Sequence, residues 1–139
     1  MLLHIVARGK IGRSPEAELV ERYLKRIAWP TNVTELPERG NLPDLPRGCV
    51  TVVLDERGQD LSSTELAAKL EAWRDGGKRE ARFLIGAADG HEEAQRRNAD
   101  LLLSFGRATW PHLLVRAMLA EQLFRATSIL ANHPYHRDG

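Results

Sequence analysis

The most constraining feature of this 139-residue chain is the uninterrupted run Cys49–Leu54, which is rich in β-branched side chains. A strand with one face in water alternates apolar and polar residues, whereas a continuous apolar run is typical of a strand buried on both faces. Strands of that kind belong to parallel sheets, which need long crossover connections. The run therefore predicts an α/β domain with a mainly parallel sheet and flanking helices.

Local signals place the other elements around this strand. Ser14 followed by Pro15 predicts a helix start, with an apolar stripe that reaches Ile27. Ser62 and Glu65 form a capping box at the start of a second helix. We expect strands over 1–7, 81–85 and 101–103, with a short strand possible over 32–36, a helix over about 91–100, and a loop over 37–48. Ligands of such sheets bind beyond the carboxyl ends of the strands, here in the loops after Leu54, Ile85 and Leu103.

The last predicted helix, from His112 to about Asn132, is apolar on nearly every side. A helix of that kind must be buried on most sides, so it is either central in the domain or packed against a second subunit. In a domain this small we favour a homodimer.

Composition narrows the class of protein. With 20 Lys and Arg against 19 Asp and Glu, 42% hydrophobic and 28% charged residues, the chain is typical of one folded domain over 1–139, not of a disordered, collagen-like or membrane protein. The single Cys49 cannot form an internal disulfide and suits a cytoplasmic location. The near-zero net charge disfavours a strongly electrostatic nucleic-acid clamp.

Several clusters could carry chemistry, each with a plainer alternative. The glycine-containing segment 86–90 could approach a ligand closely, although an ordinary strand-to-helix turn is favoured. A metal site from His112, His133 and His136, with Glu121 or Asp138, fits no compact zinc spacing, and a helix would hold the first two roughly 30 Å apart.

Two polar segments suit RNA contact. The carboxy-terminal residues 133–137 carry histidine, tyrosine and arginine side chains suited to stacking on a base, and a disordered terminus is the alternative. The loop with Arg8, Lys10 and Arg13 is either a solvated turn or a phosphate contact.

Five motifs together resemble the ribosomal RNA large subunit methyltransferase H family, a branch of the SPOUT methyltransferases. They follow the family in order from Leu54 to the end of the chain: Leu54–Gly58 with Ser62–Ser63, Ile85–Gly90, Thr109–Arg116, Glu121–Ala126 and His133–Arg137. The resemblance implies a deep trefoil knot on the carboxy-terminal side and a homodimer. It also implies S-adenosylmethionine as methyl donor and, as substrate, N3 of a pseudouridine in a 23S rRNA stem-loop of the assembled ribosome.

Site residues are carried over by position. The donor site would comprise Leu54, Gly86, Phe105, Gly106, Arg107, Ala108, Thr109 and Trp110. The catalytic set would be His136 as the base that removes the N3 proton, Arg137 to neutralise charge on the ring, and Tyr135 to stack on it. The RNA contacts would be Arg8, Lys10, Arg116 and His133, and no metal is implied.

The same residues also support other interpretations. Arg116 and Arg125 could instead form structural ion pairs. The chain departs from the family pattern at Ala87, His91, Phe105–Gly106 and Trp110, so the second reading is a non-catalytic RNA- or nucleotide-binding domain that keeps the fold. A third is a metal hydrolase built on the histidines.

Overall fold

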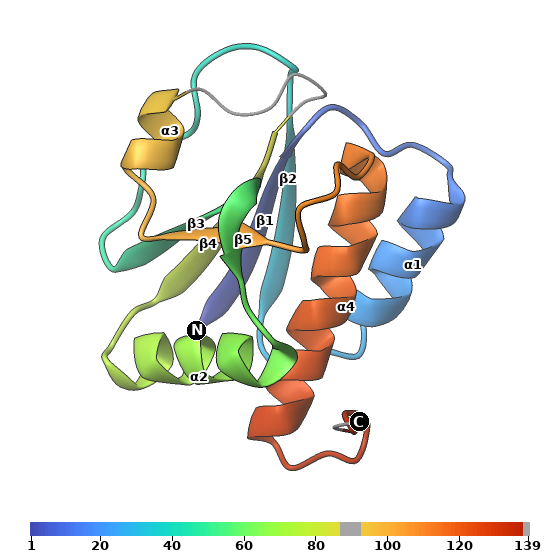
Figure 1. The fold of residues 1–139 in the computed structure, drawn as a ribbon, viewed down its shortest axis with the longest axis vertical. Coiled ribbons are helices and arrows are strands. Elements are labelled where there is room, and N and C mark those ends of the chain that lie inside the picture. Colours follow the sequence, from blue (N-terminus) through green and yellow to red (C-terminus); the bar gives the residue numbers. More distant parts are fainter. Residues whose placement is uncertain (87–92, 138–139) are drawn as a thin grey trace.

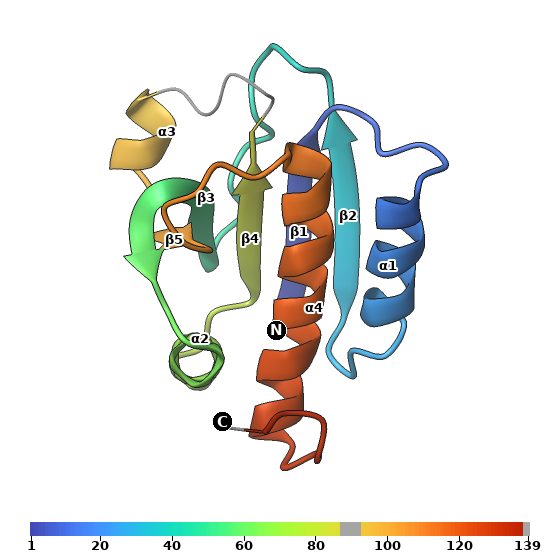
Figure 2. The same ribbon diagram turned by 45° about the vertical axis from the view of Figure 1, so that its right-hand side comes forward.

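The computed structural model describes residues 1–86 and 93–137 (Figures 1 and 2). Strands and helices alternate as the hydrophobic pattern predicts, except that β2 and β3 follow one another without a helix between them. Their order is β1 (Leu2–Arg8), α1 (Pro15–Leu24), β2 (Thr31–Leu36), β3 (Cys49–Asp60), α2 (Ser63–Asp75), β4 (Glu80–Ile85), α3 (Glu93–Arg97), β5 (Leu101–Ser104) and α4 (His112–Leu130).

The five strands form one parallel sheet in the order β2-β1-β4-β3-β5, which confirms the predicted sheet type. The short strand over 32–36 exists as β2 and pairs with β1 along its length. Because all strands run the same way, the carboxyl ends of β1, β3, β4 and β5 meet at one edge of the sheet.

The larger core lies between the sheet and the helices α1, α2 and α4 (Figure 2), where β3 contributes Val52 and α4 contributes Leu119 and Leu123. On the opposite face, Val53 belongs to a smaller cluster that Leu42 of the 37–48 connection covers. Val52 and Val53 are both fully buried. The expectation that the Cys49–Leu54 run is covered on both faces is therefore confirmed.

Helix starts agree with the capping signals, and helix ends differ slightly. The Ser14 hydroxyl accepts from the Ala17 N–H at 3.1 Å, and both hydrogen bonds of the Ser62–Glu65 capping box form. The first helix ends at Leu24 and not at Ile27, which is nevertheless buried in the following turn. The third predicted helix is present as α3, and the first residues of its predicted range lie outside the described residues.

Strand β3 is longer than its apolar run predicts. It continues past Leu54 to Asp60 after a shift in register, so that both Leu54 and Gln59 pair with Leu103 of β5. A Cβ on Gly58 would lie 2.6 Å from the carbonyl carbon and oxygen of Leu102. Only glycine allows this close crossing of β3 over β5.

Candidate functional site

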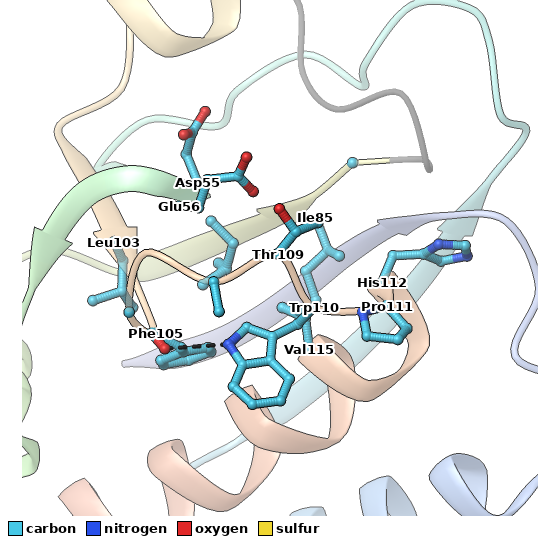
Figure 3. Close-up of a pocket in the computed structure, with 14 residues that line it drawn as sticks. Asp55, Glu56, Ile85, Leu103, Phe105, Thr109, Trp110, Pro111, His112 and Val115 are labelled. Carbon is cyan, nitrogen blue, oxygen red and sulfur yellow. Dashed lines mark hydrogen bonds between the residues drawn. The ribbon is translucent and has the colours of Figure 1, made fainter.

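A cavity of ≈ 430 Å³ opens at one edge of the sheet, between the middle of β3, the ends of β4 and β5 and the first turn of α4 (Figure 3). The residues that follow Leu54, Ile85 and Leu103 therefore converge on one cavity, as expected, although those after Leu54 continue β3 and do not form the predicted loop. Seven of the eight residues predicted for the donor site line it: Leu54, Gly86, Phe105, Gly106, Ala108, Thr109 and Trp110. Arg107, the eighth, is exposed and is not among the lining residues.

Half of the cavity wall was not predicted from the sequence: Asp55, Glu56, Ile85, Leu103, Pro111, His112 and Val115. Three of these residues directly neighbour a predicted one, and three more lie two positions from one. Extending each predicted segment by two residues in both directions would have found all of them except Val115 of α4.

The segment between β5 and α4 is closed into a turn by its own side chains. The Ser104 hydroxyl accepts from the Gly106 N–H at 3.0 Å and donates to the Gly106 carbonyl at 2.7 Å. Gly106 has a φ of 103°, which favours glycine. The Trp110 indole donates to the Phe105 carbonyl at 3.3 Å, and the two rings lie side by side in the cavity wall (Figure 3). The turn thus presents backbone to the cavity between two aromatic rings.

Asp55 links the cavity to α3. Its carboxylate accepts from the Arg57 N–H at 2.8 Å and from the Arg96 guanidinium, and its side chain is only 5% exposed. Burial acts to raise the pKa of Asp55, but these donors outweigh it and hold that pKa below its usual range. Asp55 is therefore an anion at the cavity wall at neutral pH.

The carboxy-terminal residues 133–137, here called the tail, follow a left-handed turn at Asn132, whose φ is 57°. The Asn132 N–H donates to the Ile129 carbonyl at 3.1 Å, and the His133 N–H donates to the Ser128 carbonyl at 2.9 Å. This pair of hydrogen bonds is a Schellman motif. It ends α4 and turns the tail back along the helix.

The tail is anchored on α4 by a polar cluster around Glu121. The Tyr135 hydroxyl donates to Glu121 Oε1 at 3.1 Å, and the Tyr135 ring packs on Phe124 with 4.5 Å between centroids. Burial and the bond to Glu121 raise the pKa of Tyr135 to about 12, so this phenol stays protonated at neutral pH. Arg125 donates to Glu121 at 2.8 Å and, through Nη1, contacts His136 Nδ1 at 3.2 Å.

The tail and the cavity of one chain are separate. No described tail residue lines the cavity, whose contact with α4 ends at Val115. The contact between His136 and Arg125 lies ten residues further along the helix, which corresponds to about 15 Å of helix axis. Figures 1 and 2 show the tail at the opposite end of α4 from the segment that lines the cavity.

The predicted RNA contacts differ in exposure. Lys10 and His133 are exposed, whereas Arg8 is half-buried and donates to the carbonyls of Pro37 at 2.9 Å and Gly40 at 2.6 Å. Arg116 is 1% exposed and pairs with Glu35. Its interpretation as an RNA contact is wrong for this arrangement, because a guanidinium enclosed by protein cannot reach a phosphate.

The ion-pair alternative for the two α4 arginines agrees with the structure, since Arg125 pairs with Glu121 as Arg116 does with Glu35. Arg137, at the end of the tail, is exposed.

Neither a metal cluster nor a membrane span occurs in the part of the chain that the structure describes. Within residues 1–86 and 93–137, no three or more His, Cys, Asp or Glu side chains are grouped to hold a metal ion. No helix among these residues is long and apolar enough to cross a bilayer. Asp138, Ala87 and His91, named in the alternatives above, lie outside the described residues.

Comparison with known proteins shows which family this chain matches. A family model described as predicted SPOUT methyltransferase matches residues 1–136. Proteins named ribosomal RNA large subunit methyltransferase H from Rhizorhabdus wittichii and Novosphingobium aromaticivorans are 70% and 67% identical to this chain, each over the full length of both proteins.

Solved structures show the same fold at low identity. A probable methylase family protein from Haemophilus influenzae matches with a TM-score of 0.64 at 12% identity, over 98% of this chain and 70% of that one. A probable methyltransferase from Bordetella pertussis matches with a TM-score of 0.57 at 11% identity, over 91% and 93%.

Proposed function

Because the chain belongs to the SPOUT methyltransferases, and among them to the ribosomal RNA large subunit methyltransferase H family, we propose that it methylates N3 of a pseudouridine in a 23S rRNA stem-loop. The methyl donor is S-adenosylmethionine, and the substrate is the assembled ribosome in the cytoplasm. The observation that carries this proposal is the convergence of seven predicted donor-site residues on one cavity at the carboxyl edge of the sheet.

The cavity fits such a donor in size and chemistry. Its ≈ 430 Å³ falls within the roughly 300–1,000 Å³ of small-molecule sites. Apolar side chains such as Ile85 and Val115 suit a purine ring, and the turn at Gly106 leaves open space where a side chain would stand, so backbone groups can approach the ligand. The carboxylate of Glu56 suits a cationic ligand with hydroxyl groups, whereas the carboxylate of Asp55 is engaged by Arg96 and by the Arg57 N–H. When bound, S-adenosylmethionine supplies a methyl group that its sulfonium charge already activates.

The main requirement on the protein is to align N3 with the methyl carbon and to accept the N3 proton. As the N3–C bond forms, the C–S bond breaks with its electron pair left on sulfur, and the N3 proton passes to His136. A guanidinium can only donate, so Nδ1 of His136 is the acceptor in its contact with Arg125. In this proposal the substrate replaces Arg125 at Nδ1 of His136, and the same nitrogen accepts the N3 proton.

The other tail residues have supporting roles. Tyr135 donates to Glu121 and packs on Phe124, which holds the tail in place and leaves only part of its ring for stacking on a base. Arg137 is exposed, so its guanidinium is free to approach the negative charge that develops on the pyrimidine ring.

We also propose that the working site combines two chains of a homodimer. Direct proton transfer needs about 3 Å between base and substrate, and the tail of one chain lies far beyond its own cavity along α4. A second cavity of ≈ 460 Å³ lies along α4, where Leu114 and Met118 face Leu19 of α1 and Phe105. These partly exposed apolar side chains suit a self-complementary contact that brings the partner's tail to the donor cavity.

A trefoil knot on the carboxy-terminal side is the remaining part of the proposal. One support is the close crossing of β3 over β5 at Gly58. From the end of β5, the chain leads through residues 105–111 to α4, which lies on the sheet face that α2 also covers. Threaded chains are rare, so the family is the reason to expect one here.

Two measurements test the function. Titration calorimetry should show saturable binding of S-adenosylmethionine, and ribosomes from a strain that lacks the modification should gain one methyl group at the pseudouridine, read by mass spectrometry. His136→Ala should leave donor binding intact and lower turnover by about 10²- to 10⁴-fold, the range for loss of a general base. Absence of binding heat at millimolar donor would instead favour a non-catalytic RNA-binding domain, and unchanged turnover of His136→Ala would refute its role as base.

A further inference from the structure

The buried guanidinium of Arg116 joins three segments at the amino-terminal end of α4. Its Nη1 pairs with Glu35 at the end of β2, and its Nη2 donates to the Gly9 carbonyl at 3.3 Å. The same carboxylate oxygen of Glu35 accepts from the Ile11 N–H at 2.8 Å. Neither the donor cavity nor the tail includes Arg116 or Glu35.

These contacts hold the backbone on both sides of Lys10. The carbonyl of Gly9 and the N–H of Ile11 are both engaged, while the Lys10 side chain between them is exposed. The positive φ angles of Gly9 (88°) and Gly12 (59°) give this segment a tight path. We call residues 8–13 the basic loop; it carries Arg8, Lys10 and Arg13.

The cost of burying Arg116 argues that stability alone does not explain the pair. Enclosing a guanidinium is expensive, and apolar side chains of similar volume often serve a core equally well or better. Here Nε of Arg116 has no hydrogen-bond partner among the described residues, so the desolvation cost is not fully offset. Unlike an apolar residue, the pair fixes the path of the backbone next to Lys10 through its hydrogen bonds to Gly9 and Ile11.

We propose that the Arg116–Glu35 pair is a positioning device that presents Lys10 and Arg13 of the basic loop to backbone phosphates of the RNA substrate. This rests on the proposed function. The pair acts on RNA affinity without touching RNA: Arg116 is enclosed, and Glu35, as an anion, would repel a phosphate. Arg8 does not share the presenting role, because its guanidinium ties the loop to the carbonyls of Pro37 and Gly40.

The test is a double-mutant cycle of Glu35→Gln and Lys10→Ala in ribosome methylation. Each single variant should raise the KM for ribosomes by roughly three- to tenfold, with kcat and donor affinity unchanged, as for loss of about one phosphate contact. Lys10→Ala should also reduce the slope of log KM against log salt by roughly 0.7–0.9. In the Lys10→Ala background, Glu35→Gln should raise KM by a smaller factor than in wild type, because Arg13 alone is then left for the pair to position.

Matched controls lie in the last turn of α1 and at the residue that caps it. Glu21→Gln breaks the exposed Glu21–Lys25 ion pair with the same change of charge, and Lys25→Ala removes a lysine elsewhere on the surface. Neither should change the KM for ribosomes. Exchange of the Ile11 amide with deuterium should accelerate in Glu35→Gln, and in Arg116→Lys if that variant folds, but not in Glu21→Gln.

The outcomes separate this proposal from the function. If Glu35→Gln raises KM by the same factor with and without Lys10, or lowers kcat and donor affinity, the pair is only structural and the positioning role is refuted. If Lys10→Ala leaves KM unchanged while the wild type methylates ribosomes, the basic loop does not contact RNA. Co-sedimentation with ribosomes in the absence of S-adenosylmethionine compares the ribosome affinities of the same variants without methyl transfer. The role of the basic loop can therefore be tested even if the protein does not methylate ribosomes.

Discussion

Arg116 lies within the apolar sequence of α4, and its neighbours there do not reveal its partner. The carboxylate that pairs with it is 81 positions away in sequence and the carbonyl it bonds is 107 positions away. A guanidinium in a helix can point to water, to RNA or to a distant carboxylate, and helical period alone does not distinguish these. The structure resolves the choice because Arg116 is enclosed.

The pair with Arg116 predicts a specific dependence of stability on pH. Hydrogen bonding to Arg116, more than any other contact, lowers the pKa of Glu35 in the folded state. A lowered folded pKa contributes stability above the unfolded value, about 4.3 for glutamate, and loses it as pH falls through the folded value. The free energy of unfolding of wild type minus that of Glu35→Gln should therefore be largest near pH 7 and decline below about pH 4.5.

Urea denaturation of both proteins between pH 7 and pH 3 measures this difference. Glu71→Gln, on the exposed surface of α2, is the control and should differ from wild type by a small amount that does not follow this decline. A Glu35→Gln difference that stays constant down to pH 3 would contradict the prediction.

At the scale of elements, β3 shows what sequence patterns can and cannot reveal. Its first half is continuous and apolar, and the pattern predicts both its position and its burial. Its second half, Asp55–Asp60, is polar and contains Gly58, which in sequence is typical of a loop. Its strand geometry comes from pairing with β5, a contact between residues more than 40 positions apart. Local propensity carries no information about such a partner.

Gly58→Ala tests the crossing of β3 over β5. The added Cβ would meet the Leu102 carbonyl at 2.6 Å, so the backbone of β5 must shift. We expect a loss of about 1–3 kcal/mol in the free energy of unfolding, typical of overpacking. Because the next residue, Leu103, lines the cavity, as does Phe105 after it, affinity for S-adenosylmethionine should fall as well.

Gly77→Ala is the matched control for this change. Gly77 has a φ of 88° and open space around its Cβ position, so alanine there strains the backbone at the end of α2 without displacing a neighbour. It should lower stability and leave donor affinity as in wild type. Equal effects of the two variants on donor binding, measured by calorimetry, would show that the crossing does not support the cavity.

At the scale of the whole molecule, the sequence predicts a position in the fold where a general rule relates a local sequence pattern to that position. The rule that ligands bind beyond the carboxyl ends of parallel strands identified the residues after Leu54, Ile85 and Leu103, and these line one cavity, although the first of the three segments is strand and not loop. Strand order could not be predicted, because β1 lies between β2 and β4 through crossovers that no local signal encodes. The position of the tail depends likewise on Asn132 and on tertiary contacts to Glu121 and Phe124.

The separation of tail and cavity within one chain leads to a prediction about the dimer. Ala108→Trp should fill the donor cavity from an exposed position without disturbing the core, and His136→Ala removes the proposed base. Each variant alone should be nearly inactive on ribosomes. A hybrid dimer, purified with two different affinity tags, contains one chain with an intact cavity and one with an intact tail.

If each site takes its cavity from one chain and its tail from the other, the hybrid has one complete site and one that lacks both parts. Its turnover per dimer should then be about half that of wild type, because the two sites of a symmetric dimer are equivalent. If each chain instead uses its own tail, both sites of the hybrid lack one part and the hybrid stays inactive. Dimers of each variant alone are the controls, and an inactive hybrid that still binds S-adenosylmethionine would refute the shared site while leaving methyl transfer itself in place.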